Sequence, residues 1–279
     1  MNTLEFTLVI WAGAVAAGLV GSLTGLGGGV VIVPLLVALH VDMRYAIGAA
    51  LVSVIATSSG AAAAYVKEGY SNIRVGMFLE LATTLGAVSG AFLATDVIKS
   101  TGTLAVIFGV VLLFSAYLSL RPRPDRTGAD APDPLARWLR LDGSYPTPEG
   151  PRGYHVRGVP WGFGLMYVAG ILSGLLGIGS GALKVLAMDQ VMRIPFKVST
   201  TTSNFMIGVT AAASAGLYLR RGYIDPALAM PVVLGVLLGA ALGTRVLARA
   251  RTGVLRLIFS AVIVALALQM IYNGLAGRQ

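Results

Sequence analysis

Three kinds of side chain in this sequence could bind a small oxyanion in an apolar environment. Lys184 stands in the apolar segment "GALKVLAMDQVM" and could supply a positive charge. The polar run "VSTTTSNF" follows it, and its hydroxyl and amide groups could donate hydrogen bonds; we select Thr201, Ser203 and Asn204. Glu80, in "MFLELATTLG", is the clearest acid inside an apolar segment and could carry a proton.

Each of these groups also has a structural interpretation. Lys184 could extend to a membrane interface or be neutralised by Asp189. The hydroxyls could cap a helix or join two helices. Glu80 could pair with Lys184 or Arg74. Weaker donor candidates in the first half of the chain are Ser53 and Thr57.

The composition places these groups in a membrane protein. The 279 residues are 56% hydrophobic and 12% charged, with a mean hydropathy of +0.80, whereas soluble domains carry roughly 25% charged residues. The net charge of +9 comes from basic residues in short loops, without the interleaved aromatic residues of a nucleic-acid site. We therefore expect an all-α polytopic protein that is embedded in a lipid bilayer and binds no nucleic acid.

Apolar segments fall into two sets that are separated by a polar stretch. The first set covers 4–22, 30–40, 45–66, 75–95 and 102–120, and the second covers 160–176, 181–192, 198–219, 227–248 and 254–274. Residues 121–158 are rich in Pro, Gly, Asp and Arg, which predicts a solvated linker without a core. Within it, "PLARWLRL" predicts a short surface helix with Trp138 and Leu141 at the lipid headgroups. The expected domains are a first membrane repeat (1–120), a polar cytoplasmic linker (121–158) and a second membrane repeat (159–279).

The two sets resemble each other. The stretch "AGLVGSLTGLGGG" (17–29) aligns with "AGILSGLLGIGSG" (169–181), and "KEGYSN" (67–72) aligns with "RRGYID" (220–225). Farther along, Gly86 and Gly90 align with Gly239 and Gly243, whose spacing of four suits close helix packing. Collinear matches in three segments favour an internal duplication.

The orientation of the repeats follows from how the segments pair. If the first two segments of each set form a pair and three spans follow, the repeats are inverted, with about 8–10 membrane segments in all. This arrangement places most of the Lys and Arg residues on one face. The positive-inside rule then predicts a multi-pass protein of the cell membrane, with a cytoplasmic linker and both termini outside.

Glycine clusters stand where each repeat should hold a stiff helix. Consecutive glycines destabilise a helix by about 1 kcal/mol each relative to Ala, and unwound backbone at membrane depth is tolerated where it lines a cavity. The stretch "GLGGGV" does not complete a dinucleotide loop. Paired breaks in two halves indicate a transporter's binding site, and the helices that follow them present N–H groups to an anion. The predicted substrate-binding residues at the breaks are Gly25, Gly27, Gly28, Gly29, Gly177, Gly179, Ser180 and Gly181.

The two motifs, "GSLTGLGGGVVIVPLL" and "SGLLGIGSGALKVLA", resemble the duplicated signature of the TauE/SafE family of sulfite and organosulfonate exporters. The resemblance spans both halves and excludes the linker. It implies secondary transport of small, mostly sulfur-containing anions across the cytoplasmic membrane. The halves are chemically unequal at three aligned pairs: Pro34 with Leu186, Gly28 with Ser180, and Ile32 with Lys184.

These features favour a transporter over an enzyme. Because the chain has no nucleotide-binding motif, we expect a secondary active transporter of a small oxyanion, and specifically an exporter of a sulfur-containing one. The alternatives are a passive anion channel, which would need no coupling group at Glu80, and a carrier of a non-sulfur organic anion. We expect no cofactor and no metal site, since the chain has no Cys and only two His. A coupling proton at Glu80 and a homo-oligomer are further hypotheses.

Overall fold

Helices form most of the regular structure in the computed structural model, which describes residues 3–24, 28–67, 69–98, 100–120, 133–147, 149–177, 179–247 and some residues between 261 and 275. The first half holds α1 (Thr3–Thr24), α2 (Gly29–Ala38), α3 (Met43–Lys67), α4 (Ile73–Phe92), the π-helical turn η1 (Leu93–Val97) and α5 (Thr101–Leu120). The second half holds α7 (Val159–Leu176), α8 (Gly181–Leu186), the π-helical turn η2 (Ala187–Val191), α9 (Phe196–Arg220) and α10 (Pro226–Leu247). Every predicted apolar segment up to 248 is therefore confirmed as helical, and 254–274 lies largely outside the described residues.

The length and composition of the helices identify a membrane protein. Four described stretches are long and apolar enough to cross a bilayer: Leu4–Ser22, Ile73–Val97, Val159–Leu176 and Pro226–Gly243. Apolar side chains also cover much of the outer surface; on α4, Met77, Leu81 and Leu85 are each more than 60% exposed. A soluble protein rarely presents such a surface to water, whereas lipid tails solvate it well.

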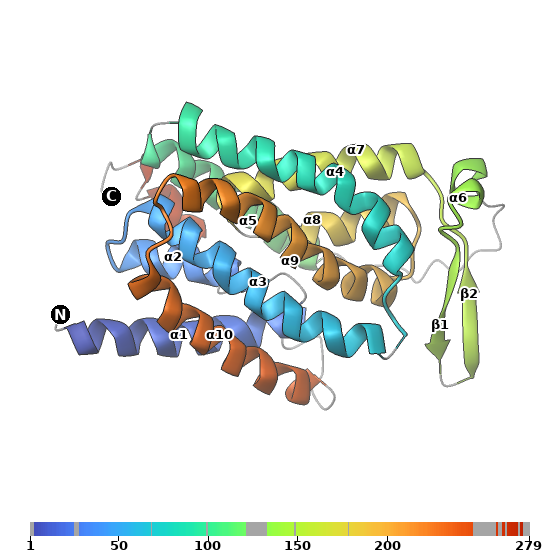
Figure 1. Cartoon of the computed structure of the whole chain (residues 1–279), viewed down its shortest axis with the longest axis horizontal. Helices are drawn as coiled ribbons and strands as arrows, with labels where there is room; N and C mark the ends of the chain where they lie inside the picture. The colour runs from blue at the N-terminus through green and yellow to red at the C-terminus, as the bar shows by residue number, and fades with distance from the viewer. Residues whose placement is uncertain are drawn as a thin grey trace.

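The two halves of the chain interlock (Figure 1). α1 packs along α10 and α4 packs along α7, while α3 packs against α9 between these two pairs. Each of these contacts joins a helix before the linker to a helix after it, so neither half packs as a separate unit. α1 begins at the end of the bundle that is remote from the linker, whereas α7 begins beside the linker and runs in the opposite direction.

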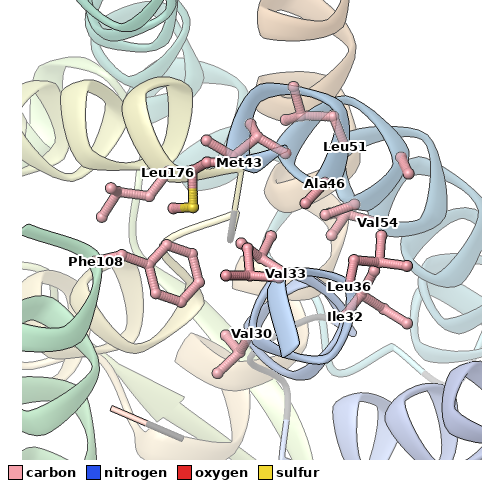
Figure 2. Close-up of a cluster of buried hydrophobic side chains, with 14 of the residues drawn as sticks. Val30, Ile32, Val33, Leu36, Met43, Ala46, Leu51, Val54, Phe108 and Leu176 are labelled. Carbon is pink, nitrogen blue, oxygen red and sulfur yellow. The ribbon is translucent and has the colours of Figure 1, made fainter. Parts of the chain in front are cut away.

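A central apolar cluster surrounds α2. This helix is apolar all round, and its buried residues include Val30, Ile32, Val33 and Leu36, as expected for a helix inside a core. Figure 2 shows these side chains beside those of α3, with Phe108 of α5 and Leu176 of α7 on another side. α2 is therefore an internal element of the bundle.

Glycines bring α4 and α7 into close contact. A Cβ added to Gly86 would lie under 3.0 Å from the carbonyl oxygen of Tyr167, and one added to Gly170 would lie equally close to that of Thr83. No real side chain fits at such distances, so the two backbones touch at these positions. The predicted close-packing role of Gly86 is confirmed.

The contact between α1 and α10 repeats this geometry. A Cβ on Gly239 would clash with the carbonyl oxygen of Val15, and one on Gly18 would clash with that of Val236. In the alignment of the two halves, Gly239 corresponds to Gly86 and Gly18 to Gly170. The carbonyl partners correspond as well, because Val15 aligns with Tyr167 and Val236 with Thr83.

The described part of the linker is folded. It contains α6 (Pro134–Trp138) and an antiparallel hairpin of β1 (Gly143–Thr147) and β2 (Gly150–Tyr154), which lies beyond one end of the helices (Figure 1). The side chains of Ala136, Leu141, Tyr154 and Val156 are buried against the adjoining ends of the helices. The expectation of a linker without a core is therefore wrong for residues 133–158, and the hairpin is an addition to the all-α architecture.

Leu141 also corrects the expected headgroup contact. The predicted short helix forms, but Leu141 is 1% exposed, whereas Trp138 is 78% exposed. Leu141 follows the helix and turns inward to the cluster that contains Val75 of α4. This small core could not be predicted from composition. The linker has few apolar residues, and they form a core only because the hairpin brings them together against apolar residues at the helix ends.

Asn72 fastens the hairpin to α4. Its Oδ1 accepts a hydrogen bond from the N–H of Val75 and caps the helix, and its Nδ2 donates to the carbonyl of Leu141 at 2.9 Å and to the Oη of Tyr154 at 2.7 Å. Burial raises the pKa of Tyr154 to about 12, although the bond from Asn72 acts in the opposite sense. The phenol is therefore neutral at physiological pH.

We expect Asn72→Ala to loosen the hairpin, because it removes a helix cap of about 1 kcal/mol and two hydrogen bonds of about 1 kcal/mol each. Asn72→Asp keeps the capping oxygen and loses the amide donor, so its effect should be smaller. Limited proteolysis of residues 139–158 in detergent measures the difference, with cleavage fastest in the Ala variant and slowest in the unmodified protein. Equal cleavage rates in all three would contradict this role.

Candidate functional site

The second predicted helix break is confirmed and is built from left-handed residues. α7 ends at Leu176 and is capped by Gly177 (φ +69°), Gly179 has φ +70°, and Ser180 precedes α8 with φ +45°. Glycine adopts this conformation at little cost. A Cβ on Gly179 would also press against Ile207 of α9, so the unwound segment is packed inside protein, as backbone at membrane depth must be.

The first break is described only in part. α1 ends at Thr24 and α2 begins at Gly29, which confirms an interruption. Gly28 is buried and has a right-handed φ of −66°. Gly25 and Gly27 lie outside the described residues.

Lys184, one turn into α8, is fully buried and joins a polar cluster. Its Nζ donates to the Oγ1 of Thr210 on α9 at 2.5 Å, and Thr210 Oγ1 lies 2.6 Å from Glu80 Oε1 on α4. A threonine hydroxyl can accept from the ammonium while it donates to the carboxylate. Thr84 Oγ1 donates to the same carboxylate oxygen at 3.2 Å. The pairing of Lys184 with Glu80 is thus observed, with Thr210 as the bridge.

The other proposed partners of these charges lie elsewhere. Asp189 accepts a hydrogen bond from the Nε2 of Gln190, and Arg74 is exposed and donates to the carbonyl of Arg140. Glu80 is 7% exposed, and its Oε2 has no hydrogen-bond partner among the described residues. A buried charged oxygen without a hydrogen-bond partner costs free energy. This cost makes Glu80 a candidate functional residue of the cluster.

The break and the polar run of α9 meet. Ser203 Oγ donates to the carbonyl of Gly181 at 3.4 Å. Next to these two residues in the sequence, Ser180 Oγ and Asn204 Nδ2 are buried and have no hydrogen-bond partner in the described part of the chain. Two polar groups with unused hydrogen-bonding capacity are therefore sequence neighbours of the residues that join the break to α9.

Three predicted ligand donors have other contacts. Thr201 Oγ1 lies 3.0 Å from the carbonyl of Tyr70, in the loop before α4. Ser53 and Thr57 bond backward within α3, to the carbonyls of Ala50 and Ser53 at 2.7 and 2.8 Å. These hydroxyls are engaged by backbone, whereas Ser180 Oγ at the break has no hydrogen-bond partner among the described residues.

Thr210 is the member of the cluster that sequence reasoning missed. It stands seven residues after Ser203, which places the two on the same face of a helix, and Ser214 continues that face four residues later. All three side chains are fully buried. This spacing of small hydroxyl residues was the available signal.

A surface pocket of about 270 Å³ lies apart from this cluster, between the loop before α4 and the linker hairpin. Its lining includes Ser71, Arg74, Asp142 and Tyr154. None of the predicted substrate-binding residues lines it, so we assign it no part in the candidate site.

Known proteins resemble the chain over nearly its whole length. The family model described as sulfite exporter TauE/SafE matches residues 10–270. A relative named "Probable membrane transporter protein YunE" of Bacillus subtilis is 29% identical, covering 98% of this chain and 99% of the relative. A "Probable membrane transporter protein" of Xylella fastidiosa is 25% identical with 97% coverage of each, and one of Sinorhizobium sp. named ORF9 is 23% identical. No solved structure matches significantly.

Proposed function

The chain belongs to the sulfite exporter TauE/SafE family, and we propose that it is a secondary active transporter that exports a small sulfur-containing oxyanion across the cell membrane. The names of its relatives support membrane transport. The observation that carries the proposal is Lys184, a fully buried ammonium beside a helix break. A charged side chain at membrane depth is expensive and is retained for function by default.

In this proposal the anion binds between the second break and α9. Lys184 supplies the counter-charge, and Ser180, Ser203 and Asn204 supply polar contacts to the anion's oxygens. The unused polar atoms of Ser180 and Asn204 support this placement. Backbone contacts at the break come from Gly177, Gly179 and Gly181, and the first break contributes Gly25 and Gly27–Gly29 from the other half.

Inverted repeats would supply the transport motion. The opposite directions of α1 and α7 and the glycine contacts at aligned positions support this architecture. Rocking of one repeat against the other can expose a central site to each side in turn. We propose a cytoplasmic linker and external termini, as the distribution of Lys and Arg favours.

Glu80 favours a coupled carrier over a passive channel. A channel that selects anions has no need of a buried carboxylate bridged to the ammonium of Lys184, because the carboxylate repels the ions that must pass. A carrier can use the same carboxylate to hold a coupling proton.

Ligand-induced thermal stabilisation of the purified protein tests the function. We expect at least one of sulfite, sulfate, thiosulfate and methanesulfonate to raise the melting temperature, since a ligand at a hundred times its Kd stabilises by about 2.7 kcal/mol. Acetate, a carboxylate that matches methanesulfonate in its methyl group and single charge, is the control anion. Stabilisation by acetate alone would favour a carrier of non-sulfur organic anions, and no response to any sulfur anion would contradict the proposal.

A further inference from the structure

We infer that a monovalent anion at Lys184 and a proton on Glu80 bind together, so that the two cross the membrane in a one-to-one ratio. This inference rests on the proposed transport function and adds the sign and stoichiometry of the coupling. Because the proton leaves together with the anion, export proceeds when the outward gradient of the anion exceeds the inward gradient of protons. It also names the preferred charge of the substrate.

The first step is competition for one positive charge. Lys184 Nζ reaches the carboxylate of Glu80 through a single hydroxyl, that of Thr210, with successive distances of 2.5 and 2.6 Å. An anion that binds the ammonium must therefore compete with the negative charge of this carboxylate. Anion and carboxylate are therefore alternative counter-charges of Lys184.

No other charge on α7, α9 or η1, the described elements that pack against α4, relieves this competition. α7, which packs along α4, contains no Asp, Glu, Lys, Arg or His, and its Tyr167 lies beside Ser89. On α9, Lys197 stands at one end over the ring of Tyr70 and Arg220 stands at the other end. In η1, Asp96 is paired with Arg221. Among the described residues packed near Glu80, Lys184 is thus its facing cation.

The second step is a count of charge. Ionised Lys184 and Glu80 sum to zero. A bound monovalent anion would leave a buried net charge of −1, which is strongly disfavoured. One proton on Glu80 returns the sum to zero, and Oε2, which has no hydrogen-bond partner among the described residues, is an available atom for it.

The third step is that the alignment of the two halves gives this cluster no counterpart, although it combines Glu80 of the first half with Lys184 of the second. Ile32 aligns with Lys184 and Val233 aligns with Glu80. Ile32 lies in the apolar cluster around α2 (Figure 2). The aligned place, formed by Ile32 of the first half and Val233 of the second, thus has no such pair, which gives one proton for each anion.

The charge count also selects the substrate. A monovalent sulfonate leaves the loaded cluster neutral, whereas a divalent anion such as sulfate leaves one negative charge uncompensated. We therefore infer a preference for monovalent over divalent oxyanions.

Proteoliposomes that contain the full chain and an internal pH dye test the coupling. Labelled methanesulfonate is loaded inside and its exit is followed at a membrane voltage clamped with valinomycin and potassium. We expect one proton to leave with each methanesulfonate, at a rate that changes less than twofold between clamped voltages of opposite sign, and sulfate to leave at least tenfold more slowly. Exit without protons, exit that follows voltage, or a preference for sulfate would overturn the inference and leave the transport function standing. If neither these two anions nor sulfite nor thiosulfate leaves the vesicles, the proposed function itself is contradicted.

Glu80→Gln separates the coupling from binding. Gln cannot take up a proton, so the unloaded cluster carries +1 and its return across the membrane is hindered. We expect net exit to fall at least tenfold while exchange of labelled for unlabelled methanesulfonate continues. Asp96→Asn is the matched control, because that carboxylate is paired at the surface with Arg221, and it should keep the one-to-one ratio. Net, proton-coupled exit by Glu80→Gln would overturn the inference; if this variant does not fold, the proton ratio of the unmodified protein decides.

Discussion

Lys184→Ala is expected to weaken anion binding by about a hundredfold or more. The ammonium is fully buried, so its attraction for an anion is little screened by water. Loss of a charged hydrogen bond in such a place costs about 3 kcal/mol, which corresponds to roughly two powers of ten in Kd. Titration with the sulfur anion that stabilises the unmodified protein measures the loss.

The same substitution also removes the counter-charge of Glu80. Breaking a buried ion pair by deleting one partner costs about 3–5 kcal/mol, so Lys184→Ala should melt earlier. The double variant Lys184→Ala, Glu80→Gln removes both charges and should recover most of that stability without recovering anion binding. Lys197→Ala is the control, because Lys197 is exposed. Wild-type affinity in the stable double variant would reject the role of Lys184.

Gly170→Ala should cause a large loss of folding stability. The new Cβ would lie under 3.0 Å from the backbone carbonyl of Thr83, and backbone cannot turn aside as a side chain can. α4 and α7 would have to separate, at a cost of about 1–3 kcal/mol or more. Because Thr83 is three residues from Glu80, this shift should also disturb the polar cluster.

Gly164→Ala provides the comparison on the same helix. A Cβ at Gly164 would meet nothing within 4 Å, so this variant should be neutral or more stable by up to about 1 kcal/mol. Gly18→Ala should resemble Gly170→Ala, since it would meet the carbonyl of Val236 in the aligned contact. Melting temperatures and yields in detergent measure all three. Equal melting of the Gly164 and Gly170 variants would contradict the close approach.

Much of the fold could be predicted because it depends on local properties. An apolar run near 20 residues long forms a helix in a membrane whatever its neighbours are, since the backbone must bond to itself there. The interruption at Gly177 and Gly179 follows in the same way from the conformational freedom of glycine. The linker core could not be predicted, because the burial of Leu141 and Tyr154 depends on helix ends that lie far from them in the sequence.

The candidate site likewise has features that the sequence predicts and features that only the tertiary structure decides. The sequence by itself determined that the chain is a helical membrane protein with broken helices, and that Lys184 and Glu80 are charges in apolar segments. Only the tertiary structure decided that Thr210 joins them, across separations of 26 and 130 residues, and that Thr201 bonds to a loop instead. The reason is physical: hydropathy and backbone freedom belong to a segment, whereas a hydrogen-bond partner depends on which faces of distant helices meet.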